Sequence, residues 1–290
     1  MFEEQSRDMV RSLIRTFTEK GYFSSKKEAL EKLKDSNWIK EKGYGHVGSI
    51  LNSSLAIQEC NKFFDELDSR LMKRLTSGIH EFKSKEFLSQ KELFERLAKK
   101  QTPDALFITC SDSRIVPNLI TQTDPGELFI IRNAGNIIPP ANAKASGEGA
   151  SIEFALKHLN IRDIIVCGHS ACGAMEAIVH PEALHELPMM KDWLQYASGT
   201  KKIIEEEYAS ASDDEKIDFA VQENVLVQIE NLHTHHAVAE ALNEGRLNLH
   251  GWVYDIRTGE VLVYYPELEQ FLPIGDRPKS PRQAKNTVSM

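Results

Sequence analysis

The sequence lacks the features that would place the protein in a membrane, outside the cell or on nucleic acid. No stretch approaches the ~20 consecutive apolar residues of a transmembrane helix. Residues 1–4 include two acidic and no basic side chains, and no apolar segment follows them, so we expect no secretory signal and a cytoplasmic protein. The 35 Lys and Arg are outnumbered by 43 Asp and Glu, for a formal net charge of −8. Because nucleic-acid binding needs basic side chains to displace the counterions of phosphate, we expect no nucleic-acid partner.

Cysteine is scarce, and the chain shows no internal repeat. The four cysteines are Cys60, Cys110, Cys167 and Cys172. In a long chain without a secretory signal they are interpreted as thiols or metal ligands rather than as a disulfide framework. Hydrophobic residues make up 41% of the chain and charged residues 27%, the balance of a globular protein with a sizeable core. A chain of 290 residues fits one domain or two.

The first hundred residues are predicted to be helical. Met9, Leu13 and Phe17 have helical spacing, and further helices are expected up to about residue 33, over residues 54–67 and over residues 88–97. We expect residues 1–70 to form a helical N-terminal extension of unknown role. At the other end, residues 276–290 contain two prolines and several charges, and we expect them to be a loosely ordered tail.

From residue 105 onward, short apolar runs alternate with helical patterns. The runs cover residues 105–110, 127–131, 163–167 and 249–255, and helical periodicity appears at residues 150–159 and 218–232. Such runs are typical of buried parallel strands. A turn at Thr258-Gly259 leads into residues 261–265, which we predict to be an antiparallel edge strand. The predicted fold is α/β: a mostly parallel β-sheet with one antiparallel edge strand, helices on both faces and an N-terminal helical extension.

Two of the predicted parallel strands end in residues that suit metal binding. The first ends in the motif CSDSR at residues 110–114, and the third ends in CGHSACG at residues 167–173. Ligands of open α/β sheets bind beyond the carboxyl ends of the strands. If both ends face one crevice, Cys110, His169 and Cys172 form a three-ligand set with a fourth position open, which is the arrangement of catalytic zinc. We interpret Cys60 and Cys167 as packing residues.

These paired motifs resemble the β-class carbonic anhydrases, in particular their plant-like branch. The resemblance extends to PGE at 125–127, RNAGN at 132–136, GEGASIE at 147–153 and HGWVY at 250–254, so it covers about residues 70–275. It implies that residues 71–275 form a catalytic domain with one Zn²⁺ held by Cys110, His169 and Cys172. The implied reaction is the reversible hydration of carbon dioxide to bicarbonate and a proton, by attack of zinc-bound hydroxide.

The resemblance also implies catalytic roles for Asp112 and Arg114. In the family the aspartate accepts a hydrogen bond from the zinc-bound hydroxide, and the arginine clamps its carboxylate in a bidentate pair. The family has a second state, in which the aspartate itself binds zinc and closes the site, and the sequence leaves both states open. Because two thiolates neutralise the charge of the metal, we expect an alkaline-leaning pH–rate profile.

Four further residues are implied to bind substrate. Gln101 matches a glutamine that donates to bicarbonate, usually from the neighbouring subunit, and Phe129 and Ala134 match the walls of the carbon dioxide pocket. The backbone N–H of Gly173 matches a bicarbonate contact, since the absence of a Cβ permits close approach. The resemblance further implies a homo-oligomer built from dimers that exchange the helices before the first strand. No membrane partner is expected, because the chain has no long apolar run.

Two other functions stay open on the sequence alone. The same site could hydrolyse carbonyl sulfide or carbon disulfide, because one sequence does not reveal the width of the access channel. Alternatively, zinc could stabilise a scaffold without catalytic activity, although the ligand set and the Asp112–Arg114 pair are complete. Activity toward carbon dioxide and the effect of changing Asp112 discriminate between these functions.

Overall fold

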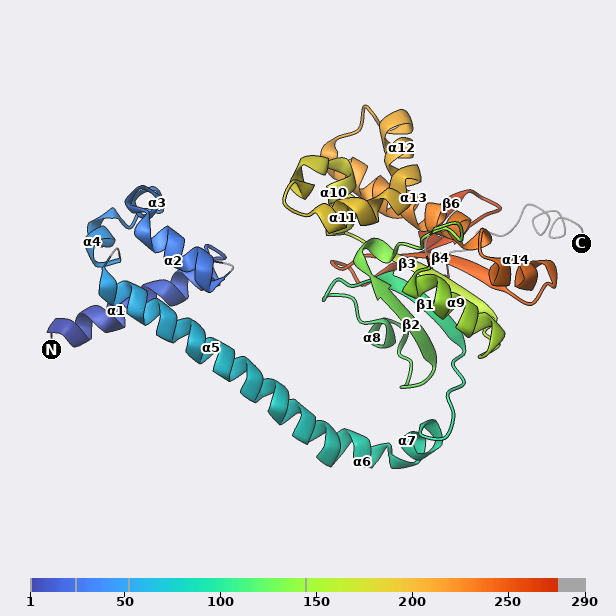
Figure 1. The fold of residues 1–290 in the computed structure, drawn as a ribbon, viewed down its shortest axis with the longest axis horizontal. Coiled ribbons are helices and arrows are strands. Elements are labelled where there is room, and N and C mark those ends of the chain that lie inside the picture. The colour runs from blue at the N-terminus through green and yellow to red at the C-terminus, as the bar shows by residue number, and fades with distance from the viewer. Residues whose placement is uncertain (1, 24, 52, 144, 276–290) are drawn as a thin grey trace, which may run out of the picture. The chain divides into compact units, whose positions relative to one another are not determined.

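The described part of residues 1–97 folds into helices, whereas strands and helices alternate along the chain from residue 105 onward (Figure 1). The computed structural model describes residues 2–23, 25–51, 53–143 and 145–275, and the chain divides into two units, Met1–Arg96 and Leu97–Met290. The predicted tail, residues 276–290, lies outside the described residues. No helix in the described part of the chain is long and apolar enough to cross a membrane.

The N-terminal unit is helical, as predicted, and buries an aromatic cluster. Phe17 is fully buried, and the rings of Phe23, Trp38 and Tyr44 meet it edge-on at centroid distances of 5.5, 5.7 and 4.8 Å. Edge-to-face contacts of this kind add to the stabilisation that burial provides. The helices are α1 (Phe2–Glu19), α2 (Lys26–Lys34), α3 (Ser36–Glu41), η1 (Gly45–Val47), α4 (Gly48–Leu51), α5 (Ser54–Glu81), η2 (Phe82–Glu86), α6 (Phe87–Ser89) and α7 (Lys91–Leu97).

Helix α5 is longer than predicted. It begins where expected, with the Ser53 hydroxyl accepting from the N–H of Ala56 at 3.3 Å, but it runs through residue 70 to Glu81. The π-helical segment η2 then continues it. The predicted end at residue 67 was wrong, because neither glycine nor proline follows until Gly78 and nothing in that stretch stops a helix.

The second unit contains a six-stranded sheet in the order β2-β1-β3-β4-β5-β6. The first four of these strands are parallel, and β5 is antiparallel to both of its neighbours. All six residues of β1 are buried, as expected of a central parallel strand. The strands are β1 (Ala105–Cys110), β2 (Leu128–Asn133), β3 (Asp163–His169), β4 (Asn248–Tyr254), β5 (Val261–Tyr265) and β6 (Gln270–Pro273).

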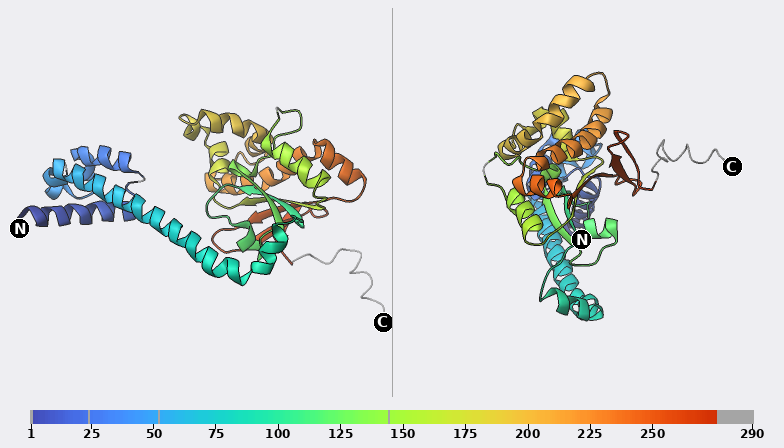
Figure 2. Two further views of the ribbon diagram at one scale, coloured as in Figure 1. Left: turned by 60° about the horizontal axis from the view of Figure 1, so that its bottom comes forward. Right: turned by 90° about the vertical axis from the view of Figure 1, so that its right-hand side faces the viewer.

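One face of the sheet carries the main hydrophobic core, which helices cover (Figure 2). Helix α13 crosses β3 and β4 closely, since a Cβ at Gly168 or Gly251 would lie 3.0 Å from the Val225 side chain. The opposite face holds a smaller buried cluster that includes Phe107 and Cys167. The helices of this unit are α8 (Pro117–Thr121), η3 (Ala134–Asn136), α9 (Gly147–Lys157), α10 (Gly173–Val179), η4 (Pro181–Leu184), α11 (Pro188–Trp193), η5 (Leu194–Ala197), α12 (Ser198–Glu207), α13 (Asp213–His233) and α14 (His236–Asn243).

The predicted α/β class is confirmed, with one addition at the sheet edge. Strand β5 was expected to be the edge, but β6 pairs outside it, with Val263 opposite Leu272 and Tyr264 opposite Phe271. The Tyr264 and Phe271 rings pack 5.2 Å apart. This four-residue strand was missed because it is too short to show the alternation from which strands are predicted.

Candidate metal centre

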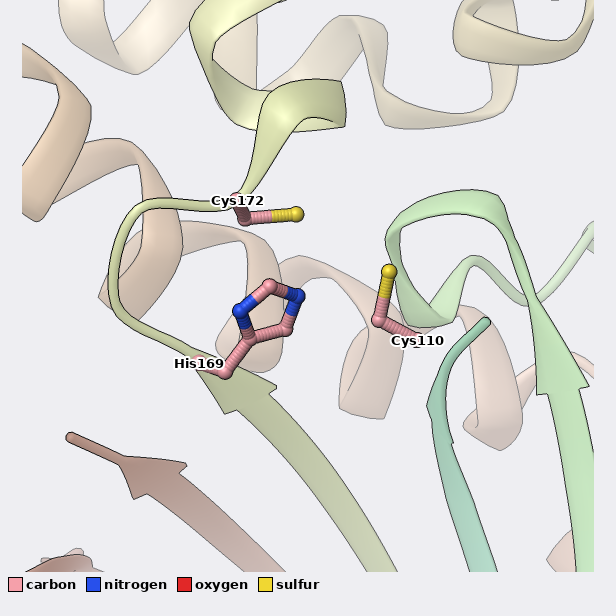
Figure 3. Close-up of side chains that lie close together, drawn as sticks. All are labelled: Cys110, His169 and Cys172. Atoms are coloured by element: carbon pink, nitrogen blue, oxygen red, sulfur yellow. The ribbon is translucent and has the colours of Figure 1, made fainter. Parts of the chain in front are cut away.

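The carboxyl ends of β1 and β3 bring the three predicted metal ligands together. The two strands are parallel neighbours with Thr109 opposite Cys167, so Cys110 and His169 emerge at the same edge of the sheet. Cys172 follows three residues later, immediately before α10. All three side chains are buried, and their ligand atoms lie within 4.8 Å of one another. Figure 3 shows both sulfur atoms and the imidazole ring pointing into one space.

The imidazole of His169 is oriented for metal binding. Its Nδ1 lies 2.9 Å from the backbone oxygen of Ser170, a contact that requires the proton on Nδ1 and leaves the Nε2 lone pair free. Nε2 is buried, and within the described residues it has no hydrogen-bond partner. Buried nitrogen atoms without a partner are rare, and a metal ion in the space between the three side chains would supply the missing one.

Cys110 and Cys172 shift each other's pKa in opposite directions. The pKa of Cys110 is lowered chiefly by a hydrogen bond from the Cys172 thiol, and the N–H of Gly135 lowers it further. The pKa of Cys172 is raised by the same partner and by burial. A cation at this point would displace the remaining proton, because metals bind thiolates rather than thiols. The donor set therefore fits a thiophilic divalent metal such as zinc.

Contacts from Gly135 and Arg132 hold Cys110, the first predicted ligand, in place. The N–H of Gly135 donates to the Cys110 sulfur at 3.4 Å. The guanidinium of Arg132 donates from Nε to the Cys110 carbonyl at 3.1 Å and from Nη2 to the Asp112 carbonyl at 2.7 Å. Arg132 therefore braces the turn that carries Cys110 and Asp112.

Asp112 and Arg114 form the predicted pair beside the ligands. Arg114 donates to the Asp112 carboxylate from its backbone N at 2.9 Å, from Nε at 2.9 Å and from Nη2 at 2.7 Å. These bonds, above all those from the side chain, hold the pKa of Asp112 well below its usual range. The carboxylate Oδ2 lies 4.0 Å from His169 Nε2, and Arg114 also donates to the Ala171 carbonyl at 3.0 Å. The arginine thus joins the loops that follow β1 and β3.

The four predicted substrate-binding residues lie in different settings. Phe129 on β2 is partly buried, with its ring 6.1 Å from Phe154, and Ala134 begins the η3 turn. Gly173 begins α10 and is exposed, and a Cβ there would meet no described atom within 4 Å. Gln101 is exposed on the segment between α7 and β1. That Gln101 donates to bicarbonate in a neighbouring subunit stays a prediction.

The other two cysteines lie apart from this cluster. Cys60 is buried in the core of the N-terminal unit, and burial raises its pKa to about 11. Cys167 is buried on the opposite face of the sheet, where burial raises its pKa to about 12. Both thiols therefore stay protonated at neutral pH, in agreement with their predicted packing role.

Sequence reasoning missed the residues that support the predicted ligands. Arg132, Trp193 and Asn224 contact the backbone around Cys110 and the η3 turn. Arg132 lies within the RNAGN motif, which was the only available signal. Trp193 and Asn224 are dozens of residues distant along the chain, and no local pattern marks them.

Comparisons with known proteins point to one family. A family model described as carbonic anhydrase matches residues 105–261. A carbonic anhydrase of Synechococcus elongatus is 50% identical over 192 residues, which are 66% of this chain and 71% of the relative. One from Pseudomonas aeruginosa is 44% identical over 208 residues, 72% of this chain and 94% of the relative. The solved β-carbonic anhydrase CcaA is 48% identical with a TM-score of 0.69, covering 70% of this chain and 98% of that one.

Proposed function

The chain belongs to the β-class carbonic anhydrase family, and from this premise we propose that it hydrates carbon dioxide reversibly to bicarbonate and a proton with the help of Zn²⁺. One observation carries the proposal. Two cysteines and a histidine with an unpartnered Nε2 converge beside an aspartate that an arginine holds ionised. A scaffold needs the metal ligands but has no use for an oriented carboxylate at the edge of the ligand cluster.

The proposed ligands are Cys110, His169 and Cys172, with one position left for water. When bound, Zn²⁺ lowers the pKa of water so that it provides a nucleophile near neutral pH. The protein keeps the three ligands buried and presents Nε2 of His169 in the neutral tautomer through the Ser170 carbonyl. Buried, preoriented ligands of this kind need little rearrangement on binding.

Asp112 is proposed to orient the attacking water. An ionised carboxylate only accepts hydrogen bonds, so it binds a hydrogen of the water and turns an oxygen lone pair toward the substrate. Three donors from Arg114 occupy the carboxylate and fix its plane. In this arrangement Asp112 is bound to arginine, which corresponds to the open state of the family.

The substrate is proposed to lie between Phe129, Ala134 and the N–H of Gly173. Carbon dioxide is small, linear and apolar, so apolar walls admit it, while a backbone donor suits the charged product. Phe154, whose ring packs beside Phe129, has no hydroxyl and adds only apolar surface. Gln101 is proposed to donate to bicarbonate from a second subunit.

The test compares Asp112→Asn with Asp192→Asn, which changes an exposed aspartate on α11 in the same way. We expect one zinc per chain in all three proteins and a fall of at least ~10²-fold in kcat/KM only for Asp112→Asn, about 2.7 kcal/mol of lost stabilisation. Stopped-flow assays with carbon dioxide and with carbonyl sulfide measure the rates. Equal activity of the two variants contradicts the proposal, as does a wild-type preference for carbonyl sulfide.

A homo-oligomer built from dimers is proposed for this chain. Related β-carbonic anhydrases from Sordaria macrospora are tetrameric; one is 28% identical with a TM-score of 0.60, covering 71% of this chain and 98% of that one. On one side of helix α5, Leu75 is 50% exposed and Ile79 is 68% exposed, and a second copy of the chain would bury both side chains.

Light scattering should find a monomer for the double variant Leu75→Asp, Ile79→Asp. Lys73→Asp, on the opposite side of the helix, should keep the oligomer. An intact oligomer in the double variant refutes this surface.

A further inference from the structure

Trp193 holds the peptide group that contacts the first metal ligand. It ends α11, is partly buried and donates from its indole Nε1 to the backbone oxygen of Ala134 at 2.8 Å. The N–H of that same peptide group belongs to Gly135 and donates to the Cys110 sulfur at 3.4 Å. The indole and the thiolate thus bind opposite ends of one peptide unit.

The geometry of the peptide group links the indole contact at its C=O to the direction of its N–H. A peptide unit is planar and trans, so fixing the direction of its C=O also fixes the direction of its N–H. A donor at the carbonyl further polarises the unit and strengthens the bond that its N–H makes. Gly135 has φ +79°, and a glycine leaves the backbone free to rotate unless other contacts stop it.

The next peptide group is held separately. Asn224 on α13 donates to the Gly135 carbonyl at 2.9 Å, and its own side-chain oxygen accepts from Gln228 at 3.0 Å. Both peptide groups that flank the Gly135 α-carbon are therefore anchored by side chains from distant helices. Of these anchors, only the indole binds the peptide group whose N–H contacts the sulfur.

We infer that Trp193 is a positioning residue of the metal centre, which aims the Gly135 N–H at the Cys110 thiolate and so sets how strongly this sulfur donates electrons to the metal. The inference rests on the proposed zinc centre. Trp193 is not one of the proposed ligands, and its effect passes through the Ala134–Gly135 peptide group.

The test uses Co²⁺ in place of zinc, because thiolate ligands give cobalt a charge-transfer absorption band. Trp193→Phe removes the donor and keeps an aromatic ring. Tyr196→Phe is the matched control, since this ring packs against Trp193 at 5.7 Å and loses only its hydroxyl. Trp193→His keeps a ring N–H near the position of the indole N–H and tests rescue.

We expect Trp193→Phe to shift the band to lower energy, because a thiolate without its hydrogen bond donates more readily. We also expect its zinc affinity, measured by chelator competition, to fall about tenfold, because the lost orientation of the Cys110 sulfur outweighs its stronger donation. Trp193→His should restore much of the band energy and of the zinc affinity. Tyr196→Phe should change neither the band nor the affinity. An unmoved band in Trp193→Phe, or an equal shift in Tyr196→Phe, overturns the inference. A wild-type cobalt protein without the band would instead overturn the metal centre itself.

Discussion

Gly135 is the position where a single added methyl group should be most informative. Its φ of +79° lies in the left-handed region, and a Cβ there would stand 2.9 Å from the Cβ of Ala174 and 3.3 Å from the Met175 side chain. Gly259 offers a matched control, because its φ is +78° but a Cβ there would meet nothing within 4 Å. The two substitutions to alanine therefore share the backbone strain and differ in the clash.

The expected magnitudes follow from these two contributions. An L-residue in the left-handed region costs about 1–2 kcal/mol, which should be the whole effect of Gly259→Ala. Forcing a methyl group into a packed interior adds about 1–3 kcal/mol, and the Cβ of Ala174 cannot move without its helix. We therefore expect Gly135→Ala to lower the free energy of unfolding of the second unit by roughly 2–5 kcal/mol.

Urea unfolding followed by tryptophan fluorescence measures this difference. The chain has three tryptophans, and a Trp38→Phe background leaves only Trp193 and Trp252, both in the second unit. Shifts of the urea midpoint at constant m-value convert to free energies. If Gly135→Ala costs no more than Gly259→Ala, the close approach of η3 to α10 is not a constraint, and the reasoning fails.

Three further predictions concern other parts of the molecule. Burial raises the pKa of Glu223, so the folded state loses stability as pH rises from the ordinary carboxyl value toward this raised pKa. Glu223→Gln should flatten this part of the curve of urea midpoint against pH, and an unchanged slope would contradict it. Glu59 is buried and accepts from Arg11, so Glu59→Ala should destabilise the N-terminal unit by about 1–3 kcal/mol. Hydrogen exchange in α1 and α5 measures this loss, and unaltered protection would refute it. Removing the metal with a chelator should lower the melting temperature of the second unit alone. A parallel loss of hydrogen-exchange protection in α1 would contradict this prediction.

Much of the second unit was predictable because short stretches of its sequence indicate its strands. Buried parallel strands are apolar runs, and each of the four parallel strands was predicted within a few residues of its observed position. Helix α5 and strand β6 were less predictable. The end of α5 depends on where a capping or breaking residue occurs, and β6 forms only because Leu272 and Phe271 find partners on β5.

The sequence by itself determined the candidate ligands and the acid–base pair. Cys110 and Asp112 lie two residues apart, as do Asp112 and Arg114, so their proximity needs no tertiary information. Cys110 and His169 meet because parallel neighbouring strands present their carboxyl ends at one edge, a consequence of the fold class.

Only the tertiary structure decided what holds these residues in place. The imidazole has its Nε2 free because Nδ1 meets the Ser170 carbonyl, and the thiolate of Cys110 faces a peptide group that Trp193 orients from 59 residues away along the chain. Contacts of this kind join segments that are far apart in the sequence. The residues around a tryptophan do not indicate which distant backbone group its indole will bind. Short sequence motifs therefore determine which residue types the centre contains, whereas tertiary packing determines its geometry.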